Sequence, residues 1–363
     1  MERLKLGYVG AGYLAQRVHL PNLASLPEIE LAAIAEVRPK LGKRIQEKFR
    51  IPKLCRDHRE LAADPSIRAV MVSGHFAGQG EIARDLLLAG KDVLMEKPMA
   101  VSVEQAERIL AAERESGRRL MVAYMKRYDS GNLKVKTLIE GFRKSGELGE
   151  VRYVRQHGFC GDWVAGLDTP FEGSDEPVPP PPVAPGTEPK GKPAWMPDAF
   201  FDRYVGYLQQ YTHNVNLVRF FLDAGDRVKV KYVDLDSGNG ISGVVVLEVA
   251  GVRTIVESGS VAYHAWEEHT TVYFDRGWVR THAPPLLQPN HQATVEVYQA
   301  AQDGPVASEH FAVKGWPWAF KEELRHFAGC LATGAPFRSP ASDALADVRT
   351  LEEIYRQFVK ANS

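Results

Sequence analysis

A glycine-rich turn near the start of the chain has the residue spacing of a dinucleotide-binding site. Gly10-Ala11-Gly12-Tyr13-Leu14-Ala15 is a GxGxxA pattern that follows a strand-like run, Leu4–Val9, and opens a helix-like stretch. The first glycine permits a tight turn, the second lets the backbone approach a pyrophosphate, and the small alanine allows helix and strand to pack closely. The start of the helix then offers N–H groups to the phosphates.

An acidic residue at the end of the next strand-like run completes this signal. Glu36 follows Leu31–Ala35 and stands about 24 positions after Gly12. A carboxylate there accepts hydrogen bonds from the adenosine ribose and repels a 2′-phosphate, so we predict NAD in preference to NADP. Arg38, two positions further on, keeps NADP as the alternative because its guanidinium can meet a phosphate.

The elements that must position these residues fall into two classes along the chain. Up to about residue 120, short apolar runs alternate with amphipathic stretches such as Pro39–Phe49 and Val103–Ser116, which predicts a parallel sheet with helices on both faces. After about residue 125, strand-like runs follow one another without helices between them. We therefore predict an α/β Rossmann domain over residues 1–124. We expect an α+β domain with a large, mostly antiparallel open sheet over residues 125–363. The C-terminal helices belong to this second domain, with packing back on the first as an alternative.

A proline-rich segment, residues 166–198, stands apart from both classes. Its composition predicts a surface loop or a semi-rigid linker. The alternative is a lid or an oligomer-contact arm, because long loops in compact proteins are often functional.

A second motif connects the chain to a known family. Ala89-Gly90-Lys91-Asp92-Val93-Leu94-Met95-Glu96-Lys97-Pro98 matches the pattern AGKxVxxEKP, and together with the glycine turn it resembles the Gfo/Idh/MocA family of NAD(P)-dependent oxidoreductases. The resemblance implies that Lys97 lies beside the nicotinamide and the substrate hydroxyl, with a cis Lys97–Pro98 bond. Hydride leaves a carbinol carbon only as the hydroxyl proton is removed, and a lysine can orient that oxygen and stabilise its developing charge.

A downstream histidine, His213, is the second catalytic candidate that the resemblance implies. The family pattern there is Asp-x-x-x-His-x-x-Asp, but this chain has Gln209 and Asn216 in place of the carboxylates. Helical spacing puts both amides on the same face as His213, where they can orient the imidazole or bind substrate hydroxyls but cannot hold a proton. A structural role for His213 is the alternative.

The candidate residues are, for catalysis, Lys97 and His213; for the cofactor, Gly10, Gly12, Tyr13, Leu14, Ala15, Glu36, Arg38, Ser73, His75, Glu96 and Lys97; and for the substrate, Arg127, Tyr128, Gln209 and Asn216.

Composition excludes several other classes of function. The 363 residues carry a net charge of −1, which argues against broad capture of nucleic acid or of an anionic membrane. No apolar run approaches the roughly 18 residues that span a bilayer. Three widely spaced cysteines indicate reduced thiols in a cytoplasmic protein, and no histidine or cysteine spacing predicts a metal site.

These observations together predict a dehydrogenase for a secondary hydroxyl, or the matching ketone, of a sugar, aminosugar or cyclitol, with secondary metabolism as one setting. We expect no nucleic-acid or membrane partner, and the resemblance implies a homodimer or homotetramer. Two alternatives stay open: an NAD-dependent glycosidase that oxidises its substrate transiently, and a non-catalytic regulator that senses NAD and a sugar.

Overall fold

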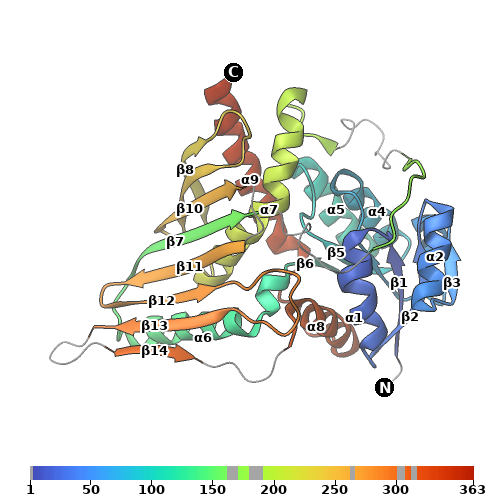
Figure 1. Cartoon of the computed structure of the whole chain (residues 1–363), viewed down its shortest axis with the longest axis horizontal. Coiled ribbons are helices and arrows are strands. Elements are labelled where there is room, and N and C mark those ends of the chain that lie inside the picture. The colour runs from blue at the N-terminus through green and yellow to red at the C-terminus, as the bar shows by residue number, and fades with distance from the viewer. Residues whose placement is uncertain (1–2, 162–170, 180–190, 262–265, 301–306, 312–316) are drawn as a thin grey trace. The chain divides into compact units, whose positions relative to one another are not determined.

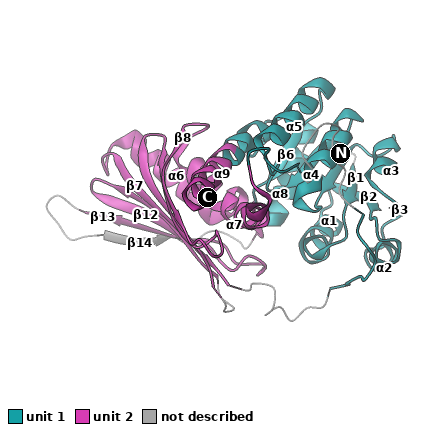
Figure 2. Cartoon of the chain, turned by 90° about the horizontal axis from the view of Figure 1, so that it is seen from above, with its two compact units in different colours: residues 1–124, 169–195, 320–348 teal, residues 125–168, 196–319, 349–363 magenta. Residues whose placement is uncertain are grey.

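A computed structural model describes residues 3–161, 171–179, 191–261, 266–300, 307–311 and 317–363 (Figure 1). The chain forms two compact units (Figure 2). Unit 1 comprises Met1–Tyr124, Thr169–Trp195 and Phe320–Val348, and unit 2 comprises Met125–Asp168, Met196–Ala319 and Arg349–Ser363. The units therefore interleave along the chain, and the expected division into domains 1–124 and 125–363 stays a prediction.

Unit 1 is built on a six-stranded sheet with the order β3-β2-β1-β4-β5-β6. Every pair of neighbouring strands is parallel. The strands are β1 (Leu4–Val9), β2 (Ile29–Ala35), β3 (Lys53–Cys55), β4 (Ala69–Val72), β5 (Asp92–Glu96) and β6 (Leu120–Ala123). The order reverses direction between β1 and β4, as in the doubly wound Rossmann fold that the alternating pattern predicts.

Helices connect these strands because parallel neighbours need a crossover. A π-helical turn, Ala15–His19, leads into α1 (Leu20–Ser25), and the other helices are α2 (Pro39–Phe49), α3 (His58–Ala63), α4 (Phe76–Leu88), α5 (Val103–Ser116) and α8 (Ala319–Thr333). Val70, Val93, Leu86 and Ile109 belong to one fully buried core that β4, β5, α4 and α5 share. Helix α4 begins at Phe76 because His75 caps it, accepting a hydrogen bond from the Ala77 N–H at 3.4 Å.

Unit 2 is built on an eight-stranded sheet with the order β14-β13-β12-β11-β7-β10-β9-β8. Its pairs are antiparallel except β7 with β10, which confirms the predicted mostly antiparallel sheet. The strands are β7 (Val151–Cys160), β8 (Val228–Leu235), β9 (Gly243–Val249), β10 (Val252–Ser260), β11 (Trp266–Phe274), β12 (Gly277–His282), β13 (Thr294–Gln299) and β14 (Ala307–Phe311). The sequence pattern did not predict β7, although it lies inside this sheet.

One face of the second sheet is covered by helices (Figure 1). Helix α6 (Ser130–Ser145) contacts β12 and β13, and α7 (Asp198–Leu222) contacts β7, β9 and β10. A short 3-10 helix, Met125–Tyr128, precedes α6, and α9 (Ala341–Asn362) ends the chain. Among the described residues, no helix combines the length and apolar character needed to cross a membrane.

Candidate functional site

The cofactor candidates of unit 1 gather at one edge of its sheet. Gly10 directly follows β1, Glu36 follows β2 and Ser73 follows β4, while Glu96 is the last residue of β5 and Lys97 comes next. Because the strands are parallel, their carboxyl ends share one edge of the sheet. Ligands of doubly wound folds bind at this edge, in the crevice where the strand order reverses. The topology thus brings residues that are far apart in sequence to the expected dinucleotide site.

The two glycines of the turn meet different surroundings. Gly10 has a positive φ of 98°, and a Cβ built on it would lie 2.4 Å from the Ser73 carbonyl oxygen. Only glycine therefore allows β1 and β4 to stay this close. Apart from its chain neighbours, no atom of the described residues lies within 4 Å of a Cβ built on Gly12, so the backbone there is open to a ligand. A pyrophosphate can approach such a backbone closely, and the turn therefore fits a dinucleotide.

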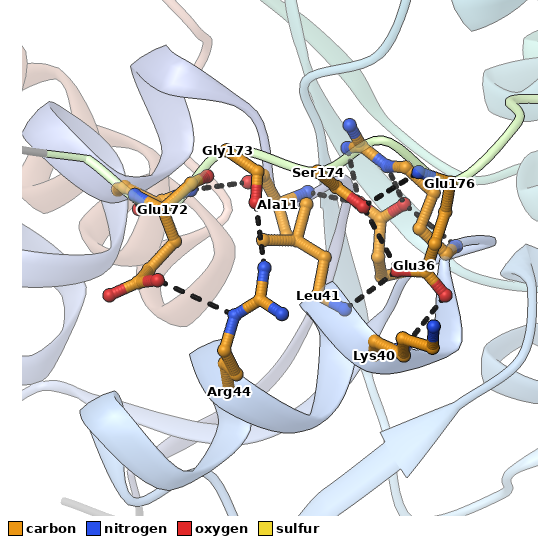
Figure 3. Close-up of polar contacts among 11 residues, drawn as sticks. Ala11, Glu36, Lys40, Leu41, Arg44, Glu172, Gly173, Ser174 and Glu176 are labelled. Atoms are coloured by element: carbon orange, nitrogen blue, oxygen red, sulfur yellow. Dashed lines mark hydrogen bonds and ion pairs between the residues drawn. The ribbon is translucent and has the colours of Figure 1, made fainter.

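Glu36 lies against the same turn (Figure 3). Its side chain is 2% exposed, and its Oε2 accepts a hydrogen bond from the Ala11 N–H at 2.7 Å. The guanidinium of Arg38 donates to both carboxylate oxygens, at 2.7 Å from Nε and 3.0 Å from Nη2. The hydrogen bonds from Arg38 to Glu36 raise the pKa of Arg38, so the cation is held beside the carboxylate. This arrangement places a carboxylate and a cation side by side.

The backbone around Lys97 is held on both sides. The Lys97–Pro98 bond is cis, as the resemblance implies. Gln79 Nε2 donates to the carbonyl oxygens of Glu96 at 2.9 Å and of Pro98 at 2.7 Å, and the Lys97 N–H donates to Glu96 Oε2 at 3.1 Å. The other Glu96 oxygen lies 2.9 Å from His19 Nε2 inside the unit. These contacts fix the turn from which the half-buried Lys97 side chain projects.

The remaining cofactor candidates have structural partners of their own. His75 caps α4, and the Tyr13 ring packs edge-on against Phe171 with 5.2 Å between centroids. Leu14 precedes the π-helical turn, and Ala15, which is 1% exposed, begins it. The small size of Ala15 lets this turn lie close to the sheet, as the GxGxxA pattern predicts.

In unit 2, α7 places two of its three polar candidates in the interior. His213 and Asn216 are 4% and 2% exposed, whereas Gln209 is exposed. Arg127 Nε donates to Asn216 Oδ1 at 2.7 Å, so the amide that replaces a family carboxylate binds a guanidinium. The neighbouring Tyr128 is 2% exposed. The structure thus brings Arg127 and Asn216 together and places Gln209 at the surface of this helix.

A buried ion pair beside these residues was not predicted. Lys126 Nζ bonds both carboxylate oxygens of Glu268, and the two side chains are only 5% and 2% exposed. Lys126 also borders a small pocket of unit 2 that Asp129, Asn132 and Trp318 help to line. Lys126 could have been considered from the sequence, because it directly precedes the substrate candidate Arg127. Glu268 had none, because its partner lies 142 residues away.

Comparison with known proteins finds a family similarity in the first part of the chain. Residues 4–124 match the model of the Gfo/Idh/MocA oxidoreductases, which is described as an oxidoreductase family with an NAD-binding Rossmann fold. This confirms the NAD(P) class of cofactor that the glycine turn predicts. The inositol 2-dehydrogenase of Salmonella paratyphi B is 29% identical over 170 residues, which are 46% of this chain and 49% of that protein. The chain thus spans about half the length of this curated relative.

Two further similarities extend over nearly the whole chain. The myo-inositol 2-dehydrogenase of Thermotoga maritima is 22% identical over 345 residues, covering 92% of this chain and 90% of that protein. The crystal structure of KijD10, a 3-ketoreductase from Actinomadura kijaniata in complex with NADP and TDP-benzene, superposes with a TM-score of 0.73. It is 21% identical and covers 98% of each chain, a likeness that shows the fold. Over residues 4–124, the chain is similar to the Gfo/Idh/MocA family of oxidoreductases.

Proposed function

We propose that this protein is an NAD(P)-dependent oxidoreductase that transfers a hydride between the nicotinamide and a carbon of a sugar, aminosugar or cyclitol. The reacting group is a secondary hydroxyl in one direction and the matching ketone in the other. The observation that supports this most directly is the shared sheet edge of the Gly10–Gly12 turn, Glu36 and Lys97. The similar dehydrogenases of inositol and the similar 3-ketoreductase act, by their names, on such hydroxyl or keto groups.

Lys97 and His213 divide the proton chemistry in this proposal. NAD(P), when bound, accepts or supplies the hydride. Lys97 orients the hydroxyl oxygen and stabilises the negative charge that develops on it, and His213 takes the hydroxyl proton as the C–H bond breaks. The carbinol loses a hydride and a proton and becomes a ketone. The hydrogen bonds from Gln79 to the carbonyls on both sides of Lys97 keep its position constant during this change.

We propose NAD as the preferred cofactor. The buried Glu36 carboxylate lies against the Ala11 N–H, where it can accept hydrogen bonds from ribose hydroxyls. A 2′-phosphate there would meet this negative charge. Arg38 is already paired with Glu36, so it offers less to a phosphate than an unpaired guanidinium would.

On the substrate side, Arg127 and Asn216 form a buried polar pair that we propose contacts sugar hydroxyls. The replacement of the family carboxylates by Gln209 and Asn216 supports a substrate that differs from simple inositol. We further propose a cytoplasmic homodimer or homotetramer, on the basis of the family resemblance.

The test is the formation of NADH by the purified protein over a panel of sugars, aminosugars and cyclitols, with keto sugars and NADH for the reverse direction. Lys97→Ala and His213→Ala should each lower kcat/KM by about 10²–10⁴-fold. Lys144→Ala, which removes an exposed lysine from the last turn of α6, is the matched control and should not change it. Unchanged turnover in Lys97→Ala, or no turnover in either direction, would overturn the proposal. Release of an aglycone without net NADH would instead identify the glycosidase.

A further inference from the structure

A short segment of the proline-rich region is fastened to the nucleotide-binding face of unit 1. We call residues 171–176 the strap (Figure 3). Gln16, on the π-helical turn, accepts a hydrogen bond from the Glu172 N–H at 2.8 Å and donates one to the Glu172 carbonyl at 3.0 Å. Arg44, on α2, donates to the Gly173 carbonyl at 2.6 Å. The strap therefore bridges the helix that follows the glycine turn and the helix that follows Glu36.

The strap ends in a carboxylate at the start of α2. Glu176 Oε1 accepts the Lys40 N–H at 3.0 Å, and Oε2 accepts the Leu41 N–H and the Ser174 hydroxyl, each at 3.0 Å. Arg38, at the N-cap position of α2, forms no side-chain cap, so Glu176 supplies the cap from a distant part of the chain. Partial burial acts to raise the pKa of Glu176, but the hydrogen bonds from Lys40 and Leu41 outweigh it and lower the pKa. Glu176 is therefore ionised at neutral pH.

Two groups near the expected ribose position are suited to bind a phosphate: the guanidinium of Arg38 and the N–H groups that begin α2. Both are engaged by carboxylates of the chain itself, Arg38 by Glu36 and the helix start by Glu176. The hydrogen bonds to Glu36 are the main cause of the raised pKa of Arg38, and the negative charge of Glu176 adds to it. A 2′-phosphate that approached these groups would either displace the Glu176 carboxylate or be repelled by its negative charge.

We propose that Glu176 is a cofactor-specificity residue, whose carboxylate occupies the start of α2 and thereby denies these N–H donors to the 2′-phosphate of NADP. This inference rests on the proposed dinucleotide site. It gives the strap a function of its own, which is to keep the 2′-phosphate away from the start of α2. Two carboxylates thus act against the 2′-phosphate. Glu36 engages the guanidinium of Arg38, and Glu176 engages the N–H groups at the start of α2.

The experiment measures binding of adenosine fragments, so that it needs neither substrate nor turnover. ADP and adenosine 2′,5′-bisphosphate are titrated by calorimetry into the wild-type protein and into Glu176→Gln, which keeps the side-chain shape but removes the charge. Glu172→Gln is the matched control, because Glu172 lies on the same strap and pairs with Arg44 at 3.4 Å rather than with the start of α2. NAD and NADP are then titrated in the same way.

We expect the wild-type protein to bind ADP more tightly than the bisphosphate. Glu176→Gln should shift the ratio of the two dissociation constants toward the bisphosphate by about tenfold or more, and Glu172→Gln by less than about twofold. A shift of less than about fivefold in Glu176→Gln, or an equal shift in Glu172→Gln, would overturn the proposal. Failure to oxidise or reduce any carbohydrate would refute the proposed function but would leave this binding ratio, so the two failures are distinguishable.

Discussion

Two alanine substitutions in the nucleotide turn separate its structural role from its binding role. In Gly10→Ala, the new methyl group would lie 2.4 Å from the Ser73 carbonyl oxygen, and the residue would have to keep a φ of 98°. In Gly12→Ala, the methyl group would meet no atom of the described residues within 4 Å, apart from those of its two chain neighbours. The two changes add the same group two residues apart, and only the first collides with the protein.

The structure sets the size of each effect. A non-glycine residue at positive φ costs about 1–2 kcal/mol, and relief of the contact with Ser73 requires β1 and β4 to move apart. We therefore expect Gly10→Ala to lower the free energy of unfolding by about 2–4 kcal/mol. Gly12 has no positive φ, so Gly12→Ala should change that free energy by less than about 1 kcal/mol. It should weaken NAD binding by about tenfold or more, because the methyl group fills the space that the pyrophosphate needs.

The assay is urea unfolding of both variants without nucleotide, followed by calorimetric titration of each folded variant with NAD. The wild-type protein is the reference in both measurements. If Gly12→Ala loses as much stability as Gly10→Ala, the space over the turn is not open. If it binds NAD as tightly as the wild type, the pyrophosphate does not approach Gly12. Either result refutes the reasoning that places the dinucleotide on this turn.

Three further predictions concern charged or titratable side chains inside the two units. Lys126→Met leaves the Glu268 carboxylate buried without its cation and should cost about 3–5 kcal/mol in urea unfolding, most of which a second change, Glu268→Leu, should restore. Burial, helped by the charge of Glu96, raises the pKa of Glu323, so the stability that its neutral form contributes is lost as pH rises above about 4.5. Glu323→Gln should therefore melt at a higher temperature than the wild type at about pH 8 and show a smaller difference at about pH 5. Burial and the neighbouring histidines lower the pKa of His269 to about 4, so stability should fall as pH drops from about 6.5 to 4. A His269→Gln variant should flatten this fall, and an unchanged slope would contradict the assignment.

The local sequence was sufficient to predict the nucleotide turn and most of the strands and helices that support it. The bounds predicted for β1, α2 and α5 are those of the structure, since strand and helix periodicity are properties of neighbouring residues. Glu36, the acidic residue after β2, could also be predicted, because one helical segment and one strand set the number of residues between Gly12 and Glu36. The Gfo/Idh/MocA motif around Lys97 carried the rest of the functional inference.

Only the tertiary structure decided which distant side chains meet. β7 carries two exposed arginines, Arg152 and Arg155, three positions apart, so its sequence lacks the strict alternation of a strand. It lies inside its sheet because it pairs with β10 and β11, about a hundred residues away. The pairing of Lys126 with Glu268 and the seat of Glu176 on α2 join segments that are similarly remote. Such contacts depend on how whole elements pack, and no spacing along the chain encodes them. Local patterns therefore predicted the fold and the cofactor class, whereas the contact of the Glu176 carboxylate with the start of α2 is seen only in the folded chain.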